Sequence, residues 1–123
     1  MLDETLRRLA TEGKNIASVS TLMRDGTPQT TPMWVDADDD HLLLNTEVHR
    51  QKFKNIERDP RVTVTIWEAS NPYAYAELRG RVVDMVRGPE ARSHIDQLSQ
   101  KYNGTDYPNP IQSERVILKV APK

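Results

Sequence analysis

The stretch RVTVTIWEASNPYAYAELRGRVVDMV, from Arg61 to Val86, contains the two clearest strands of the chain. Its first eight residues alternate between apolar and polar side chains, which is the pattern of a half-buried strand. After a short loop over residues 70–72, a long strand is expected over residues 73–86. Gly80 interrupts that strand, which indicates a bulge or a point where another backbone comes close. The stretch therefore predicts antiparallel β structure.

Further strands are expected on both sides of this stretch. An Asp-Gly turn at residues 24–27 predicts a hairpin, and Pro32 in its second strand favours a sheet edge. The additional strands are expected over residues 15–23, 28–36, 41–46 and 114–120, with a polar turn over residues 37–40. About six short strands at this spacing favour a mainly β fold, a small antiparallel barrel with peripheral helices.

Three peripheral helices are predicted from capping residues and apolar spacing. Leucines recur at helical spacing near the start of the chain, where Asp3 can cap the helix and Gly13 can stop it. A short helix with Phe53 and Ile56 on one face is expected after residue 50. The strongest helix begins near Pro89 and ends at Gly104.

Composition limits the classes of function. The 123 residues fit one domain, residues 1–123, and the net charge of −1 argues against a general nucleic-acid binder. The chain has no cysteine, and no apolar run approaches the roughly 20 residues of a membrane span. The charged N-terminus lacks the apolar centre of a signal peptide. We expect a soluble cytoplasmic protein.

The segment NTEVHRQKFKNIERDP, residues 45–60, carries an unusual arrangement of charge. Arg50, Lys52 and Lys54 lie at the start of the predicted short helix, where cations oppose the helix dipole. A bound anion would offset that cost, because a helix start also offers free backbone N–H groups. The hydroxyl of Thr46 can add a further donor. The alternative is a solvated charged face, which is what most runs of charge are.

Metal and nucleophile chemistry find little support. Asp36, Asp38, Asp40 and Glu47 have calcium-loop offsets, but His41 stands where such a loop needs glycine, so a polar turn is the simpler interpretation. The three histidines lack metal-ligand spacing, and no serine lies in a nucleophile motif. We expect no catalytic side chain, and chemistry supplied by a cofactor.

Several segments, taken together and in order, resemble one family. They are GTPQTTPMWVD, LLLNTEVHRQKFKNIERDPRVTVTIWE, NPYAYAELRGRV and ERVILKVAP, and the resemblance extends over nearly the whole chain, from about Leu9 to Pro122. The chain resembles the split β-barrel flavin/deazaflavin oxidoreductases, which are related to pyridoxamine 5′-phosphate oxidase, and especially the small actinobacterial F420-dependent enzymes. The resemblance implies a six-stranded split barrel and a homodimer with cofactor sites at the subunit interface.

The resemblance also implies cofactor-binding residues. Lys52 matches the lysine that holds the cofactor phosphate, and Thr46, Arg50 and Asn55 match positions around the same phosphate. The strand along which the tricyclic ring lies, with backbone groups addressing the pyrimidine edge, corresponds to Pro32, Met33, Trp34 and Val35. The strand near the partner subunit corresponds to Tyr73, Tyr75 and Gly80.

The function implied by this resemblance is hydride transfer from reduced F420 to an unsaturated small organic substrate. Two alternatives keep the fold: an FMN-dependent oxidoreductase, and a non-catalytic protein that stores or carries F420 or flavin. A module that binds anions or nucleic acid fits the neutral charge balance poorly. The chain ends at Lys123, without the additional C-terminal residues by which pyridoxamine phosphate oxidases hold their substrate, so we do not expect that reaction.

Overall fold

The alternating stretch forms the centre of the sheet in the computed structural model, which describes residues 1–123. β5 (Arg61–Glu68) and β6 (Asn71–Arg87) pair antiparallel, with Val64 opposite Leu78. β5 buries every second side chain, as its alternation predicts. The expected loop is shorter than predicted, because only residues 69–70 turn and β6 already begins at Asn71.

β6 is long because it serves both halves of the sheet. Its first part pairs with β5, its second part pairs with β7, and Gly80 pairs with Val62 on one side and Pro122 on the other. A Cβ atom at Gly80 would lie 2.0 Å from the carbonyl oxygen of Ala121. Gly80 is therefore a point of close backbone approach, while the bulge itself lies between Val82 and Asp84.

The sheet has seven strands, one more than predicted, in the order β2-β1-β5-β6-β7-β4-β3. The extra strand is β3, whose two residues lie in a segment expected to hold the end of one strand and a turn. All neighbouring strands pair antiparallel. The remaining strands are β1 (Ile16–Leu22), β2 (Pro28–Met33), β3 (Asp36–Ala37), β4 (Leu42–Glu47) and β7 (Arg115–Pro122).

The two edges of this sheet, β2 and β3, are separated in the chain only by Trp34 and Val35. Since the Cα atoms of Met33 and Asp36 can be at most about 11 Å apart, the sheet must curl until these ends of its two edges lie close together. The edges do not pair with each other, so the result is an open, split barrel.

Side chains from the helix α3 (Pro89–Asn103) occupy the split. The backbone N–H of Val35 donates to the Tyr102 hydroxyl at 3.2 Å, and Lys101 Nζ donates to the Val35 carbonyl at 2.7 Å. The Tyr102 hydroxyl in turn donates to the carbonyl of Asn15. These contacts supply the partners that a neighbouring strand would have given Val35.

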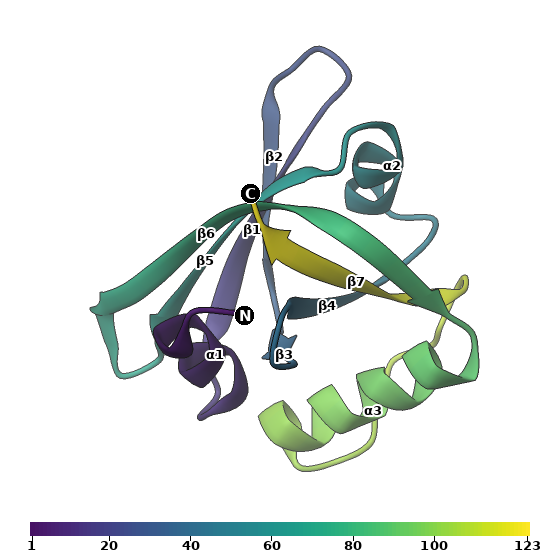
Figure 1. Ribbon diagram of the computed structural model, residues 1–123. Helices are drawn as coiled ribbons and strands as arrows, with labels where there is room; N and C mark the ends of the chain where they lie inside the picture. Colours follow the sequence, from purple (N-terminus) through teal and green to yellow (C-terminus); the bar gives the residue numbers. More distant parts are fainter.

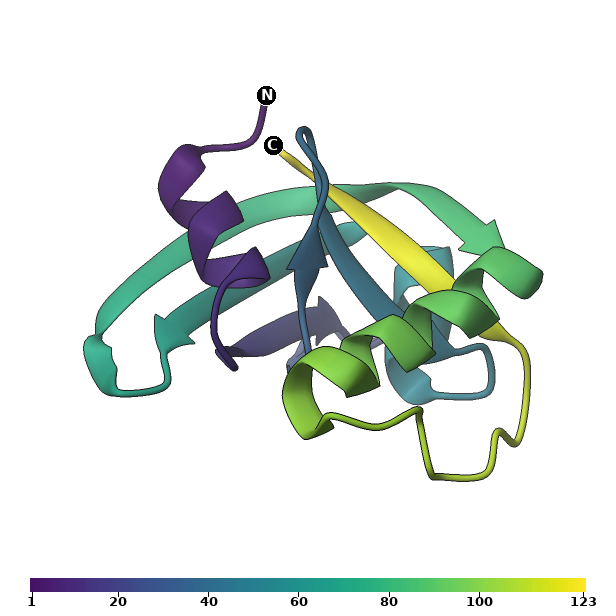
Figure 2. The ribbon, with the colours of Figure 1, turned by 90° about the horizontal axis from the view of Figure 1, so that it is seen from below.

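The other helices are α1 (Glu4–Thr11) and α2 (Gln51–Arg58), and α1 and α3 lie towards one end of the barrel (Figures 1 and 2). The predicted caps are confirmed, because Asp3 Oδ2 accepts the N–H groups of Thr5 and Leu6 at 3.1 and 3.2 Å. Gly104 ends α3 with φ of 77°, a left-handed conformation that favours glycine.

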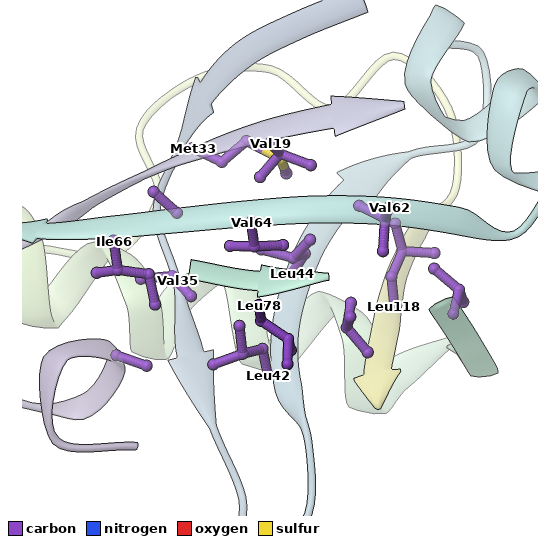
Figure 3. Close-up of a cluster of buried hydrophobic side chains, with 14 of the residues drawn as sticks. Val19, Met33, Val35, Leu42, Leu44, Val62, Val64, Ile66, Leu78 and Leu118 are labelled. Atoms are coloured by element: carbon purple, nitrogen blue, oxygen red, sulfur yellow. The ribbon is translucent and has the colours of Figure 1, made fainter. Parts of the chain in front are cut away.

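The core fills the curled sheet with aliphatic side chains. Figure 3 shows part of this cluster, to which Val19, Val64, Leu44 and Leu118 contribute from four different strands. All four are at most 1 % exposed. None of the three helices is both long enough and apolar enough to cross a membrane.

Candidate cofactor site

A cavity of about 380 Å³ lies where the start of α2 comes close to α3 and to the loop before β7. This volume falls within the range of small-molecule sites. One part of its lining is polar and cationic: Asn45, Arg50, Lys52, Asn109 and Arg115. The other part is apolar and aromatic: Ile16, Pro32, Met33, Trp34, Ile95, Leu98 and Tyr107.

Lys52 is the central cation of this cavity. It lies in the first turn of α2, where no acidic residue is present and no side chain caps the free N–H groups. Lys52 forms no ion pair. Burial, followed by the charges of Arg50 and Arg115, lowers the pKa of Lys52 to about 8. Lys52 is therefore a half-buried cation without a carboxylate partner, which suits it to bind an anion.

Arg115 is the third cation, and the sequence patterns did not identify it. It lies at the start of β7, is only 4 % exposed, and its guanidinium stands 5.0 Å over the ring of Tyr107. Its Nε and Nη1 atoms are buried and donate no hydrogen bond. Its place beside the cavity follows from the pairing of β4 with β7, which puts Arg115 opposite Glu47. Because that pairing is known only from the fold, the sequence alone could not reveal the role of Arg115.

Glu47 is a buried carboxylate among these cations. Its Oε2 atom accepts from Arg50 Nη2 at 3.2 Å and lies 3.5 Å from Arg115 Nη1. Its Oε1 atom accepts the backbone N–H groups of Gln112 and Ser113 at 2.8 and 2.7 Å. Burial alone would raise the pKa of Glu47, but these hydrogen bonds and both arginines outweigh it and lower the pKa. Glu47 is therefore ionised at neutral pH.

An aromatic wall bounds the apolar part of the cavity. Trp34 stacks on Tyr102 with ring centroids 5.1 Å apart and planes within 5°. Tyr107 meets Trp34 edge-on at 6.2 Å. Such a wall suits a flat ring, while the cations suit an anionic group attached to it.

Asn45 joins the cavity to a buried polar chain. Its Nδ2 group donates to the Ala91 carbonyl and to His94 Nδ1, both at 3.0 Å. His94 must then carry its proton on Nε2, which lies 3.3 Å from the Asp36 carboxylate. These bonds fix the orientation of the amide, and its Oδ1 atom has no partner within the chain.

The resemblance predicts cofactor binding for nine residues, with Tyr75 as the one from the strand near the partner subunit. Five of the nine line the cavity: Pro32, Met33, Trp34, Arg50 and Lys52. The other four do not line it, and the cofactor roles of all nine remain predictions. Thr46 is fully buried beside Asn45, and Asn55 Nδ2 donates to Thr21 Oγ1 at 3.0 Å. Val35 has its backbone groups bonded to α3. Tyr75 is 63 % exposed on the β5–β6 hairpin.

The three cations at the start of α2 differ in their surroundings, since Arg50 and Lys52 line the cavity and Lys54 does not. Lys54 is exposed and does not line the cavity, so the expectation of a solvated charged face describes Lys54 but not Lys52.

The acidic segment after β2 forms a turn, in which Asp38 Oδ1 accepts the N–H groups of Asp40 and His41 at 2.9 and 2.7 Å. No group of three or more His, Asp or Glu side chains is arranged to hold a metal ion.

A second cavity of about 650 Å³ is larger but less suited to a cofactor. It is lined mostly by polar residues, among them Arg61, Arg79, Arg81 and Lys123, and contains no aromatic ring. Arg61 and Arg79 are paired with Asp59 and Glu77 at 2.7 and 2.8 Å. We therefore assign the site to the cavity in which Lys52 and the aromatic wall converge.

Comparison with known protein families assigns nearly the whole chain to one family. The model of the family described as pyridoxamine 5′-phosphate oxidase matches residues 2–123. No curated protein sequence matches the chain.

Solved structures give a similar result. A structure named F420 reductase superposes with a TM-score of 0.82 at 30 % identity and covers 100 % of this chain and 96 % of its own. A conserved hypothetical protein from Mycobacterium tuberculosis superposes with a TM-score of 0.73 at 21 % identity, covering 100 % and 82 %. A FAD-binding protein from Mesorhizobium loti has a TM-score of 0.65 at 17 % identity, covering 99 % and 91 %.

Proposed function

Because the chain belongs to the pyridoxamine 5′-phosphate oxidase family, we propose that it is an oxidoreductase that binds a flavin-type cofactor in the Lys52 cavity. The observation that carries this proposal is the unpaired Lys52, which lines the cavity together with Arg50 and Arg115 and whose pKa is lowered by burial and by their charges. Flavin-type cofactors join a planar ring to a phosphate. The aromatic wall and the three cations offer matching surfaces for these two parts.

The residues of the chain have binding and orienting roles in this proposal. Lys52, Arg50 and Arg115 hold the phosphate, and the free N–H groups at the start of α2 add donors. Met33 and Trp34 lie along the ring, and Ile95 and Leu98 of α3 keep water away from it. No side chain is required to act as a nucleophile, because the reduced cofactor supplies the hydride.

Among flavin-type cofactors we propose the deazaflavin F420, with an unsaturated small organic molecule as the hydride acceptor. The likeness to a structure named F420 reductase, at 30 % identity over the whole chain, supports this choice. F420 carries more negative charge than FMN, and the extra charge favours its attraction to a cationic site.

Two other functions fit the same cavity. An FMN-dependent oxidoreductase needs the same phosphate site and ring wall. A non-catalytic carrier of F420 or flavin needs tight binding without turnover.

We also propose a homodimer in which the partner covers the exposed face of β6. Tyr73 and Tyr75, two positions apart on this strand, are 90 and 63 % exposed, and Val83 further along the strand is 46 % exposed, so β6 leaves several large apolar side chains uncovered. A second copy covering this face would bring Tyr75 toward a cofactor site at the interface.

Titration with F420 and with FMN, followed by absorbance and fluorescence, tests the proposal. We expect F420 to bind more tightly than FMN. Much tighter binding of FMN, or a protein that purifies yellow with bound flavin, would favour the FMN-dependent oxidoreductase. Tight F420 binding without turnover of any unsaturated acceptor would favour the carrier.

A further inference from the structure

We propose that Glu47 is a positioning residue, which holds Arg50, Arg115 and the loop before β7 in the arrangement that receives the anionic group. This inference rests on the anion site of the proposed function. Neither the family resemblance nor the sequence patterns gave Glu47 this role.

The contacts of Glu47 divide between its two oxygen atoms. Oε2 faces the arginines, with Arg50 Nη2 at 3.2 Å and Arg115 Nη1 at 3.5 Å. Oε1 faces the loop, where it accepts the N–H groups of Gln112 and Ser113 at 2.8 and 2.7 Å. One carboxylate therefore joins two cations to the end of a backbone loop.

That loop forms a wall of the same cavity. Residues 104–114 connect α3 to β7 and contribute Tyr107 and Asn109 to the lining. Ser113 is held further by His49, whose Nδ1 lies 2.6 Å from the Ser113 hydroxyl. Loss of the Glu47 contacts would release the end of the loop and the two arginines together.

The negative charge of Glu47 and its positioning role have opposite effects on the affinity for an anion. A negative charge beside the cations repels an incoming anion, and burying a carboxylate that is 2 % exposed is costly. If simple charge attraction governed binding, removing this charge would strengthen it. If Glu47 positions the arginines and the loop, removing it weakens binding, so the two accounts predict changes of opposite sign.

The test compares Glu47→Gln with Glu114→Gln in the full chain. Glu114, which directly precedes β7, is the control, because it is also a glutamate in an ion pair with an arginine, Arg87 at 3.1 Å, but it forms no ion pair with Arg50 or Arg115. Dissociation constants are measured for F420 by fluorescence and for inorganic pyrophosphate by calorimetry, with melting temperatures recorded alongside. We expect Glu47→Gln to weaken binding of both probes about tenfold, and Glu114→Gln to leave it nearly unchanged.

A double-mutant cycle with Arg50→Ala separates positioning from a general loss of stability. If Glu47 acts through Arg50, the effect of Glu47→Gln shrinks in the Arg50→Ala background. Should Glu47→Gln fail to fold, Glu47→Asp carries the test, because it keeps the charge and shortens the reach. We expect Glu47→Asp to weaken binding as well.

Tighter or unchanged pyrophosphate binding in the folded Glu47 variants would overturn the inference, whatever the melting temperature. A wild-type chain that binds pyrophosphate but neither F420 nor FMN would overturn the proposed function and leave the Glu47 comparison intact. A wild-type chain that binds none of the three would overturn both.

Discussion

Lys52 and Lys54 lie two positions apart at the start of one helix, yet their surroundings differ. Lys52 lines the cavity without an ion pair, and Lys54 is exposed outside it. We predict that Lys52→Ala weakens cofactor binding about 10- to 150-fold, the equivalent of one charge-assisted hydrogen bond. Lys54→Ala is the matched control and should change affinity little. Equal affinities of wild type and Lys52→Ala, at low and at high salt, would remove the phosphate role of Lys52.

The pKa of Lys52, lowered to about 8 by burial and by the neighbouring arginines, predicts a pH dependence. A bound anion favours the charged amine and raises this pKa, so the complex holds a proton that the free protein loses above pH 8. Affinity for the cofactor should therefore fall as pH rises from about 8 toward 10, while the arginines stay charged. Binding constants measured across this range test the prediction. An identical slope in Lys52→Ala would assign the effect to another group.

The sequence identified some of these residues and not others, for a physical reason. Lys52 and Arg50 could be predicted because the charge pattern and the helix start are local. Arg115 and Glu47 could not, because their meeting depends on the register of β4 against β7. A single charged residue at the start of a strand carries no local sign of its partner.

Among the elements, β6 depends most on one residue. Gly80 lies where the strand passes from β5 to β7, and a Cβ there would come within 2.0 Å of the Ala121 carbonyl oxygen. We predict that Gly80→Ala destabilises the fold by about 3 kcal/mol, because a backbone atom must move. Denaturant unfolding measures this change.

Gly26→Ala serves as a comparison for that experiment. A Cβ at Gly26 meets nothing within 4 Å, and the cost there is only the strain of a φ of 88°, about 1 kcal/mol. If Gly80→Ala proved no worse than Gly26→Ala, the close approach would not govern this part of the fold.

Element prediction succeeded where periodicity was strong. The alternation in β5 and the caps of α1 and α3 gave the right elements. β3 was missed because two residues are too few to show a period, and its only strand partner is β4. The expected strand over residues 28–36 ends at Met33, because the chain must leave one sheet edge for the other.

At the scale of the whole molecule, we predict a dimer because the apolar side chains on the exposed face of β6 need a cover. Light scattering should give about twice the chain mass of 14.1 kDa. Tyr75→Glu should weaken the dimer about tenfold or more, because it places a charge in the covered face. Arg24→Glu, in the exposed β1–β2 turn, is the control. A stable monomer at micromolar concentration would contradict this assembly and an interface location for the cofactor.

The fold of the whole molecule was more predictable than its cavity. The family resemblance predicted the split barrel, and local hairpin signals account for the pairing of β1 with β2 and of β5 with β6. The pairings of β1 with β5 and of β4 with β7 join strands that are far apart in the chain, so local signals do not predict them. The cavity also needs Ile95 and Leu98 from α3 and Tyr107 from the following loop. Ile95 and Leu98 look like an ordinary apolar helix stripe in the sequence, and only the docking of α3 shows that they line the cavity.

The way in which α3 occupies the barrel split has a consequence for hydrogen exchange. The amide of Val35 is protected by a side chain 67 residues further along the chain, so its exchange reports on the docking of α3. Tyr102→Phe should accelerate exchange at Val35 roughly fivefold or more, while the amide of Val64 in the central strand keeps its rate. Because the two edges cannot be held together until α3 has folded, we expect the barrel to open there first. Val35 would then exchange through a local opening that needs less free energy than global unfolding.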